Sequence, residues 1–294
     1  MQALPEDAAA QEVRPFLKWT GGKQRLLPQL IPLLPPLEEV HTYIEPFAGS
    51  AALFFALEFD AGDRIVLNDK NEALVNVYRC LLHWPSNTIK ALEQMARRHR
   101  KDPAGTYKLL RDQFNAGIAD DATRAATALY LNRTCFNGVW RVNRAGEFNV
   151  PMGAYDHEKL VICNYHTLIS ASERLKAVAV EITNADFALT LYALHGAPSK
   201  AFVYFDPPYV PVSATADFTG YTADKFDEND LLRLKRCCNL INEVGQYFMV
   251  SNSDTALARS TFKDYRIDTI SRRGNINSDV SKRGDVRELV IRNY

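Results

Sequence analysis

Short apolar runs recur along the chain and are separated by segments with helical periodicity. This alternation is typical of an α/β fold with a mainly parallel sheet. The clearest run covers residues 201–205; its β-branched and aromatic residues predict a buried central strand. Further strands are expected at residues 42–45, 64–68, 178–182, 247–251, 265–271 and 286–293.

Helices are expected at residues 24–34, 51–59 and 229–243. A longer helical region covers residues 72–128, with a break at Asp102-Pro103-Ala104-Gly105. A helical block between strands predicts an inserted subdomain with its own task, which we interpret as recognition. The predicted organisation is a disordered N-terminus at 1–14, a sheet domain at 15–72 and 166–294, and the inserted subdomain at 73–165.

The stretch Asp206-Pro207-Pro208-Tyr209 directly follows the predicted central strand. Two prolines remove two backbone donors and stiffen the turn, which leaves carbonyl oxygens exposed as acceptors. A carboxylate, a free carbonyl and an aromatic ring together suit a planar group that carries an amino function, such as a nucleobase. The alternative is an ordinary turn that ends a strand.

A strand, a tight loop, a helix and a second strand follow one another from Thr42 to Asp69. This order predicts a nucleoside site, in which the loop passes under the ligand and Asp69 accepts from ribose hydroxyls. Gly49 is followed by Ser50 and Ala51 and not by a second glycine, which disfavours a pyrophosphate. S-adenosylmethionine, which has no phosphate, fits better. A strand-helix-strand unit without a ligand is the alternative.

Two further positions are candidates for cofactor contacts. Gly21 and Gly22 precede Lys23 at a predicted helix start, where backbone can approach a ligand closely. A plain turn explains the glycines equally well. Asp186 and Phe187 follow a predicted strand and could grip the adenine of the cofactor by its amino group and its face. Asp186 could instead be a helix N-cap.

The stretch from Tyr130 to Pro151 is dense in Asn, Arg and aromatic residues. Residues 140–143 and 147–150 alternate around an Arg-Ala-Gly turn, which predicts a hairpin. Arginine matches the acceptors of guanine, asparagine matches adenine, and aromatic rings can enter a base stack. A simple surface hairpin is the alternative. The loop at 272–285 is interpreted either as a phosphate contact or as an exposed loop.

Charge and cysteine content narrow the function class. Lys and Arg number 35 against 35 Asp and Glu, so affinity for nucleic acid must come from local clusters. Residues 97–147 supply one, with ten basic residues against five acidic ones. Five cysteines without CxxC spacing argue against a zinc knuckle and a disulfide framework. No apolar run reaches the roughly 18 residues of a membrane span, so we expect a cytoplasmic protein without a metal.

Several of these motifs, in this order, resemble those of the Dam-type DNA adenine-N6 methyltransferases, the GATC-type family. The motifs are Phe16-Leu17-Lys18-Trp19-Thr20-Gly21-Gly22-Lys23, Glu45-Pro46-Phe47-Ala48-Gly49-Ser50, Leu67-Asn68-Asp69, residues 132–151, Asp206-Pro207-Pro208-Tyr209 and Ser251-Asn252-Ser253-Asp254. The resemblance covers the chain from about Pro15 to its end. It implies a Rossmann-like adenosylmethionine-dependent methyltransferase sheet with an inserted helical target-recognition subdomain that bears a β-hairpin. It also implies duplex GATC as the substrate and a bacterial or phage origin.

The motifs and the resemblance together define three sets of expected site residues. The catalytic set is Asp206, Pro207, Pro208 and Tyr209. The cofactor set is Trp19, Lys23, Glu45, Phe47, Gly49, Asp69, Asp186 and Phe187. The DNA-binding set is Lys18, Arg133, Phe136, Asn137, Val139, Arg141, Asn143, Pro151 and Tyr155.

The expected reaction is methyl transfer to the N6 atom of an adenine that has been flipped out of the duplex. Val139-Trp140 and Met152 stand where relatives vary, which leaves the flanking preference open. Alternatives are a longer site that contains GAT, and transfer to cytosine N4, to RNA or to a protein amide. A protein that only binds DNA is disfavoured, because Asp69 and the loop at 206–209 are intact. We expect a monomer, either a solitary enzyme or the partner of a restriction nuclease.

Overall fold

A mixed sheet of seven strands forms the centre of the molecule in the computed structural model, which describes residues 1–3, 15–19, 21–197, 199–209, 226–273 and 285–294. The strand order is β5-β4-β2-β6-β7-β9-β8. The first five strands in this order run parallel, whereas β9 is antiparallel to β7 and β8. The strands are β2 Val40–Glu45, β4 Arg64–Asn68, β5 Ala179–Thr183, β6 Lys200–Phe205, β7 Tyr247–Ser253, β8 Arg266–Arg273 and β9 Asp285–Arg292.

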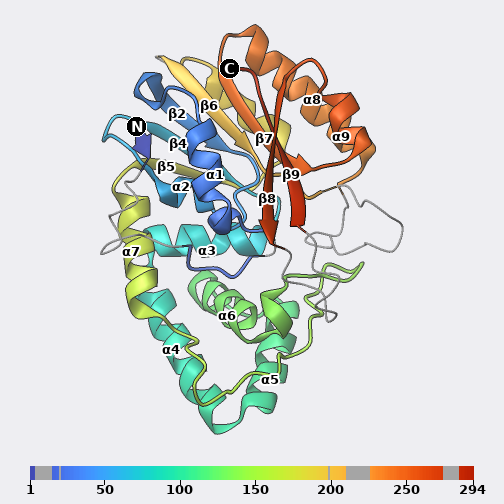
Figure 1. The fold of residues 1–294 in the computed structure, drawn as a ribbon. Coiled ribbons are helices and arrows are strands. Elements are labelled where there is room, and N and C mark those ends of the chain that lie inside the picture. Colours follow the sequence, from blue (N-terminus) through green and yellow to red (C-terminus); the bar gives the residue numbers. More distant parts are fainter. Residues whose placement is uncertain (4–14, 20, 198, 210–225, 274–284) are drawn as a thin grey trace.

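Alternate residues of the central strands enter two separate apolar cores. On β6, Phe202 and Tyr204 face one core, while Val203 and Phe205 face the other. Helices α8 and α9 cover the second face, and α1, α2 and α7 lie on the first (Figure 1). A strand that is buried on both sides reads as a continuous apolar run, which is why residues 201–205 were recognisable from sequence.

A helical lobe interrupts the sheet between β4 and β5. Figure 1 shows α4, α5 and α6 beyond one end of the sheet, with α3 between the sheet and the lobe. The helices are α1 Leu27–Leu30, α2 Ala52–Ala56, α3 Glu72–His83, α4 Pro85–Lys101, α5 Pro103–Asn115, α6 Asp121–Thr134, α7 Tyr165–Lys176, α8 Glu228–Glu243 and α9 Ala256–Thr261. The predicted break at 102–105 is present, because Asp102 caps α5 and Pro103 begins it.

Two predicted helices are shorter than expected. Residues 24–34 divide into the 3₁₀ turns Lys23–Arg25 and Ile31–Leu33 on either side of α1. Pro28 and Pro32 explain the division, because a proline inside a helix removes a donor and clashes with the preceding turn. The helix expected at 51–59 ends at Ala56, and the strand β3 (Leu57–Glu58) follows.

The prediction that all of residues 1–14 are disordered is wrong for the first three. Gln2–Ala3 form β1, which pairs antiparallel with β3, and Met1 is buried. The N-terminal ammonium donates a hydrogen bond to the carbonyl oxygen of Leu37 at 3.3 Å. This pairing joins segments far apart in the sequence, so local composition could not reveal it. Residues 4–14 lie outside the described part of the chain.

The predicted hairpin is present in a minimal form. Val142 and Phe148 make one antiparallel bridge, and the N–H of Asn143 donates to the carbonyl oxygen of Glu147 at 2.9 Å. Most of the predicted loop at 272–285 lies outside the described residues, as does 210–225. Within the described ranges, no helix is long and apolar enough to cross a membrane.

Candidate active site

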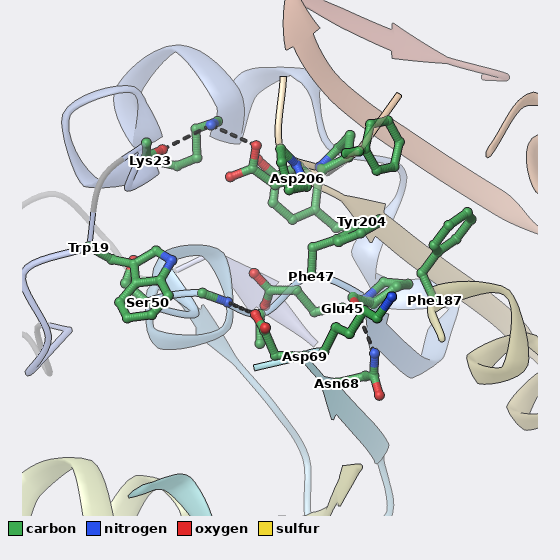
Figure 2. Close-up of a pocket in the computed structure, with 18 of the residues that line it drawn as sticks. Trp19, Lys23, Glu45, Phe47, Ser50, Asn68, Asp69, Phe187, Tyr204 and Asp206 are labelled. Carbon is green, nitrogen blue, oxygen red and sulfur yellow. Dashed lines mark hydrogen bonds and ion pairs between the residues drawn. The ribbon is translucent and has the colours of Figure 1, made fainter. Parts of the chain in front are cut away.

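The loops after β2, β4, β5 and β6 meet at one edge of the sheet, because these strands are parallel and adjacent. They enclose a cavity of about 310 Å³ (Figure 2). All twelve residues predicted for the cofactor and for catalysis line this cavity. Neighbouring carboxyl ends of parallel strands are a common place for ligands in such sheets. Residues of the motifs at 45–50, 67–69 and 206–209, which are far apart in the sequence, therefore form one site.

The loop after β2 is held by the residues that end β4. The Asp69 carboxylate accepts from the N–H of Gly49 at 3.0 Å and from the N–H of Asn71 at 2.8 Å. Gly49 has φ +48°, and a Cβ there would lie 3.0 Å from Cδ1 of Trp19. Burial raises the pKa of Asp69, and the two backbone hydrogen bonds partly offset this effect. Glycine is favoured here because the left-handed backbone disfavours a side chain and the close indole leaves little room for one.

Glu45 ends β2 as a buried acid at the floor of the cavity. Its carboxylate accepts a hydrogen bond from the Tyr43 hydroxyl at 2.9 Å. Burial raises the pKa of Glu45 well above its ordinary value; the Tyr43 hydrogen bond opposes the shift and the charge of Asp206 adds to it. A cation in the cavity would favour the ionised form of Glu45, so this position is suited to a positively charged ligand.

Two aromatic residues, one after β2 and one after β5, form a wall on one side of the cavity. The rings of Phe47 and Phe187 stack with centroids 5.1 Å apart. Asp186 accepts from the N–H of Ala188 at 3.0 Å and from Arg233 at 2.7 Å. Burial opposes ionisation of Asp186, but the Arg233 and Ala188 hydrogen bonds outweigh it and lower its pKa. Asp186 thus caps the 3₁₀ turn Phe187–Leu194, as the alternative interpretation predicted, and it lines the cavity as well.

Asp206, in the loop after β6, forms an ion pair with the buried Lys23. Nζ of Lys23 lies 2.7 Å from Oδ1 of Asp206 and 3.6 Å from Oε2 of Glu288. The Tyr209 hydroxyl donates to Oε2 of Glu288 at 2.6 Å. Burial, with the charges of Asp206 and Glu288, raises the pKa of Tyr209 well above its ordinary value, so the phenol stays neutral. In Figure 2 the Lys23 side chain points to Asp206 on the same side of the cavity.

The nine predicted DNA-binding residues lie apart from the lining of the cavity. Four of them form one surface, in which the 3₁₀ turn Phe136–Gly138 adjoins Lys18 and Tyr155. Phe136 is 53% exposed and Asn137 has φ +54°, so both residues project from a tight turn. The Tyr155 hydroxyl donates to the carbonyl oxygen of Cys135 at 2.9 Å, which fixes its ring beside the turn.

The other predicted DNA-binding residues differ in what holds them. Arg141 is exposed and donates from Nε to Oδ1 of Asn149 at 2.8 Å. Arg133 donates from Nε to the carbonyl oxygen of Val161 at 2.8 Å. Oδ1 of Asn143 accepts from two N–H groups of the hairpin turn, which gives this side chain a structural task. Pro151 is exposed and Val139 half-buried.

Sequence reasoning missed several residues of the site. Glu288 on β9 contacts both Lys23 and Tyr209 and is only 2% exposed. Arg233 on α8 holds Asp186, and Tyr204 on β6 lines the cavity floor. The one available signal for Glu288 was an acid in the predicted strand at 286–293, at a position that the strand period places on the same face as Val290. In the described ranges, no cluster of three or more His, Cys, Asp or Glu residues could hold a metal ion.

Known proteins resemble this chain over nearly its whole length. A model of the family described as D12 class N6 adenine-specific DNA methyltransferase matches residues 19–276. The type II methyltransferase M1.LlaDCHI of Lactococcus lactis subsp. cremoris is 38% identical over 96% of this chain and 96% of its own. The type II methyltransferase M.MjaIII of Methanocaldococcus jannaschii is 36% identical over 96% and 100%. A DNA adenine methylase of Serratia marcescens is 32% identical over 94% and 97%.

Proposed function

Since the chain belongs to the D12 class N6 adenine-specific DNA methyltransferases, we propose that it methylates adenine N6 in duplex DNA at GATC, after the base has been flipped out of the helix. The observation that carries this proposal is that Asp69 and Asp206 line two neighbouring parts of one cavity. The Asp69 half suits a nucleoside cofactor, and the Asp206 half suits an amino group.

S-adenosylmethionine fits the first half of the cavity. Asp69 would hold the ribose hydroxyls, and Phe47 and Phe187 offer an apolar wall for the adenine. Asp186 is oriented by Arg233, so it is the candidate to accept from the adenine amino group. Glu45 supplies a buried acid for a cationic ligand, and Trp19, Lys23 and Gly49 complete the wall. When bound, the cofactor supplies an electrophilic methyl group.

The second half of the cavity would receive the target adenine. The amino group at N6 would donate to the Asp206 carboxylate and to the carbonyl oxygen of Pro207, while the ring lies against Tyr209. These acceptors favour a pyramidal nitrogen, whose lone pair is then available for attack. Rigid Pro207 and Pro208 keep the acceptors in place, and alignment governs a direct displacement of this kind.

Asp206 has a second task as the reaction proceeds. The nitrogen becomes cationic when it accepts the methyl group, and a nearby carboxylate stabilises that charge before the proton leaves. Lys23 holds this carboxylate in place, because its Nζ lies 2.7 Å from Oδ1 of Asp206. The hydroxyl of Tyr209 is tied to Glu288, which fixes the ring against which the base would stack.

We assign DNA reading to the inserted subdomain at 73–165. Arg141 is exposed and its guanidinium is oriented by Asn149, which suits a bidentate contact with guanine. The exposed ring of Phe136 would fill the space beside the flipped base. We propose that Arg133, Asn137, Val139, Asn143, Pro151 and Tyr155 also contact the DNA, with Lys18 from the segment at 15–19. We further propose that the catalytic domain spans 15–72 and 166–294 and that the enzyme acts as a monomer.

The replacement Asp206→Ala tests the proposed mechanism. We expect the variant to bind S-adenosylmethionine as the wild type does and to lose methyl transfer to DNA by orders of magnitude. Calorimetry measures the first quantity and transfer of labelled methyl groups the second. Asp264→Ala is the matched control, because Asp264 is an exposed acid paired with Lys235. Turnover of Asp206→Ala near that of the control would remove Asp206 from the mechanism.

A further inference from the structure

The side chain of Asn132, near the end of α6, forms two hydrogen bonds with the backbone of Lys18. Oδ1 of Asn132 accepts from the N–H of Lys18 at 3.0 Å, and Nδ2 donates to the carbonyl oxygen of Lys18 at 2.9 Å. Nδ2 also donates to the carbonyl oxygen of Gly138 at 3.3 Å. Asn132 is 2% exposed. One buried amide therefore joins the segment at 15–19 to the turn Phe136–Gly138.

The Lys18 side chain lies directly over this turn. A Cβ on Gly138 would stand only 2.6 Å from Cδ of Lys18, and Gly138 has φ +66°. Nζ of Lys18 lies 5.7 Å from the centre of the Tyr155 ring. The exposed ammonium of Lys18 thus reaches the surface beside Asn137 by way of a path that only a glycine permits.

From this geometry we infer that Asn132 is a positioning residue for sequence discrimination, although its buried side chain lies beneath the reading surface. Its hydrogen bonds to Lys18 and Gly138 fix the position of Lys18 relative to the turn that carries Asn137. Hydrogen bonds to base edges distinguish bases only when donor and acceptor positions are held accurately. We place Lys18 against a base edge of the recognition site, so a change at Asn132 should relax the choice of base at that pair. This inference rests on the proposed function.

The test compares Asn132→Leu with the wild type. Rates of methylation are measured on a GATC duplex and on duplexes in which one base pair is replaced in turn, or on the preferred site if it differs. Discrimination is the kcat/KM on the preferred duplex divided by that on a substituted duplex. In Asn132→Leu this ratio should decrease by a factor of about 5 to 150 at one base pair. The dissociation constant of S-adenosylmethionine should stay unchanged, because Asn132 is absent from the cavity wall.

Asn293→Leu is the matched control. Oδ1 of Asn293 accepts from the N–H of Phe248 at 2.9 Å, and Nδ2 donates to the carbonyl oxygen of Gln246 at 2.8 Å. This variant loses the same kind of side-chain hydrogen bonds to backbone, at the start of β7. This variant should lose stability without a change in base discrimination. Gly138→Ala is a second test, because its added Cβ displaces the Lys18 side chain while Asn132 remains. This variant should reduce discrimination at the same base pair.

A double replacement separates positioning from a general structural effect. In a Lys18→Met background, Asn132→Leu should cause no further loss of discrimination, because its effect passes through the Lys18 ammonium. Additive losses in the double variant would overturn the inference, and so would unchanged discrimination in both Asn132→Leu and Gly138→Ala. If the wild type methylates no adenine, the proposed function itself fails, which is a different result.

Discussion

The indole of Trp19 stacks on the indole of Trp140, with ring centroids 6.0 Å apart and an angle of 27° between the planes. Trp19 lines the cavity and packs against Gly49. Trp140 is buried at the base of the hairpin, where it packs against Phe148 and Phe114 of α5. One aromatic pair therefore joins the proposed cofactor site to the proposed DNA-reading hairpin.

This pair provides an optical signal for cofactor binding. The chain has three tryptophans, and the third, Trp84, is exposed between α3 and α4. In a Trp84→Phe protein we expect S-adenosylmethionine to change the fluorescence emission saturably, because the ligand would lie beside Trp19. Adding Trp140→Phe should preserve the signal, and adding Trp19→Phe should abolish it. A full signal without Trp19 would place the ligand elsewhere.

Glu45→Gln is expected to stabilise the protein without cofactor while weakening cofactor binding. Because burial raises the pKa of Glu45 above its ordinary value of 4.5, the folded state retains a proton that the unfolded chain has released. The unfolding free energy therefore falls as pH rises above 4.5, by about 1.4 kcal/mol for each unit of the shift. Glutamine retains an acceptor for Tyr43 and has no charge to bury.

Urea unfolding at pH 6 and pH 8 measures the first effect of Glu45→Gln, and calorimetry with S-adenosylmethionine measures the second. The variant should be more stable than the wild type at pH 8, and its cofactor affinity should be about tenfold lower, as for loss of a charged hydrogen-bond partner. A variant less stable than the wild type at pH 8 would show that Glu45 is ionised and well solvated in the free protein.

Lys23→Met should be strongly destabilising. Lys23 is 3% exposed and is the cation between Asp206 and Glu288. Removal of one partner from a buried ion pair costs up to about 3–5 kcal/mol, and the 20% exposure of Asp206 places the expected loss at or below the lower end of this range. Chemical denaturation measures this loss. Lys263→Met, at an exposed lysine, is the control and should change stability by less than about 0.5 kcal/mol.

His99 predicts a loss of stability in acid. Its Nδ1 lies 2.7 Å from the Tyr130 hydroxyl, and its Nε2 lies 3.1 Å from Nδ1 of His157. Burial, with a smaller contribution from His157, lowers the pKa of His99 from 6.5 to about 4. The His99 imidazole of the unfolded chain binds a proton below pH 6.5, whereas that of the folded protein binds it only near pH 4. Stability therefore decreases as pH falls through this window, by up to about 3 kcal/mol.

Denaturation curves at pH 7 and pH 5 for His99→Gln check this prediction. The variant starts from lower stability, because Tyr130 loses its partner, but its stability should change less between the two pH values. His83→Gln, at an exposed histidine, should retain the full pH dependence of the wild type. An equal dependence in His99→Gln and the wild type would assign the acid sensitivity to other groups.

Local patterns were sufficient to predict the central strands, and together with the family resemblance they predicted twelve of the residues that line the cavity. The run 201–205 is buried on both faces, and the loops that follow such strands meet at one edge by the geometry of a parallel sheet. This is why Asp69 and Asp206, far apart in the chain, could be placed in one site. The expected strand at 265–271 was also found, extended to Arg266–Arg273.

Contacts between distant segments could not be predicted in the same way. Glu288 enters the site because β9 pairs with β7, and Arg233 enters because α8 packs beside Asp186. The pairing of β1 with β3 and the grip of Asn132 on Lys18 likewise depend on tertiary structure. No periodicity in a single sequence records such pairs, since each partner is consistent with many other environments.

Mapping the product tests the central claim most directly. The protein is incubated with labelled S-adenosylmethionine and unmethylated DNA of mixed sequence, and every modified base is located with its neighbours. The proposal predicts N6-methyladenine within GATC, with the label lost in Asp206→Ala. Methyl groups on cytosine, or on adenine without a shared sequence context, would contradict it.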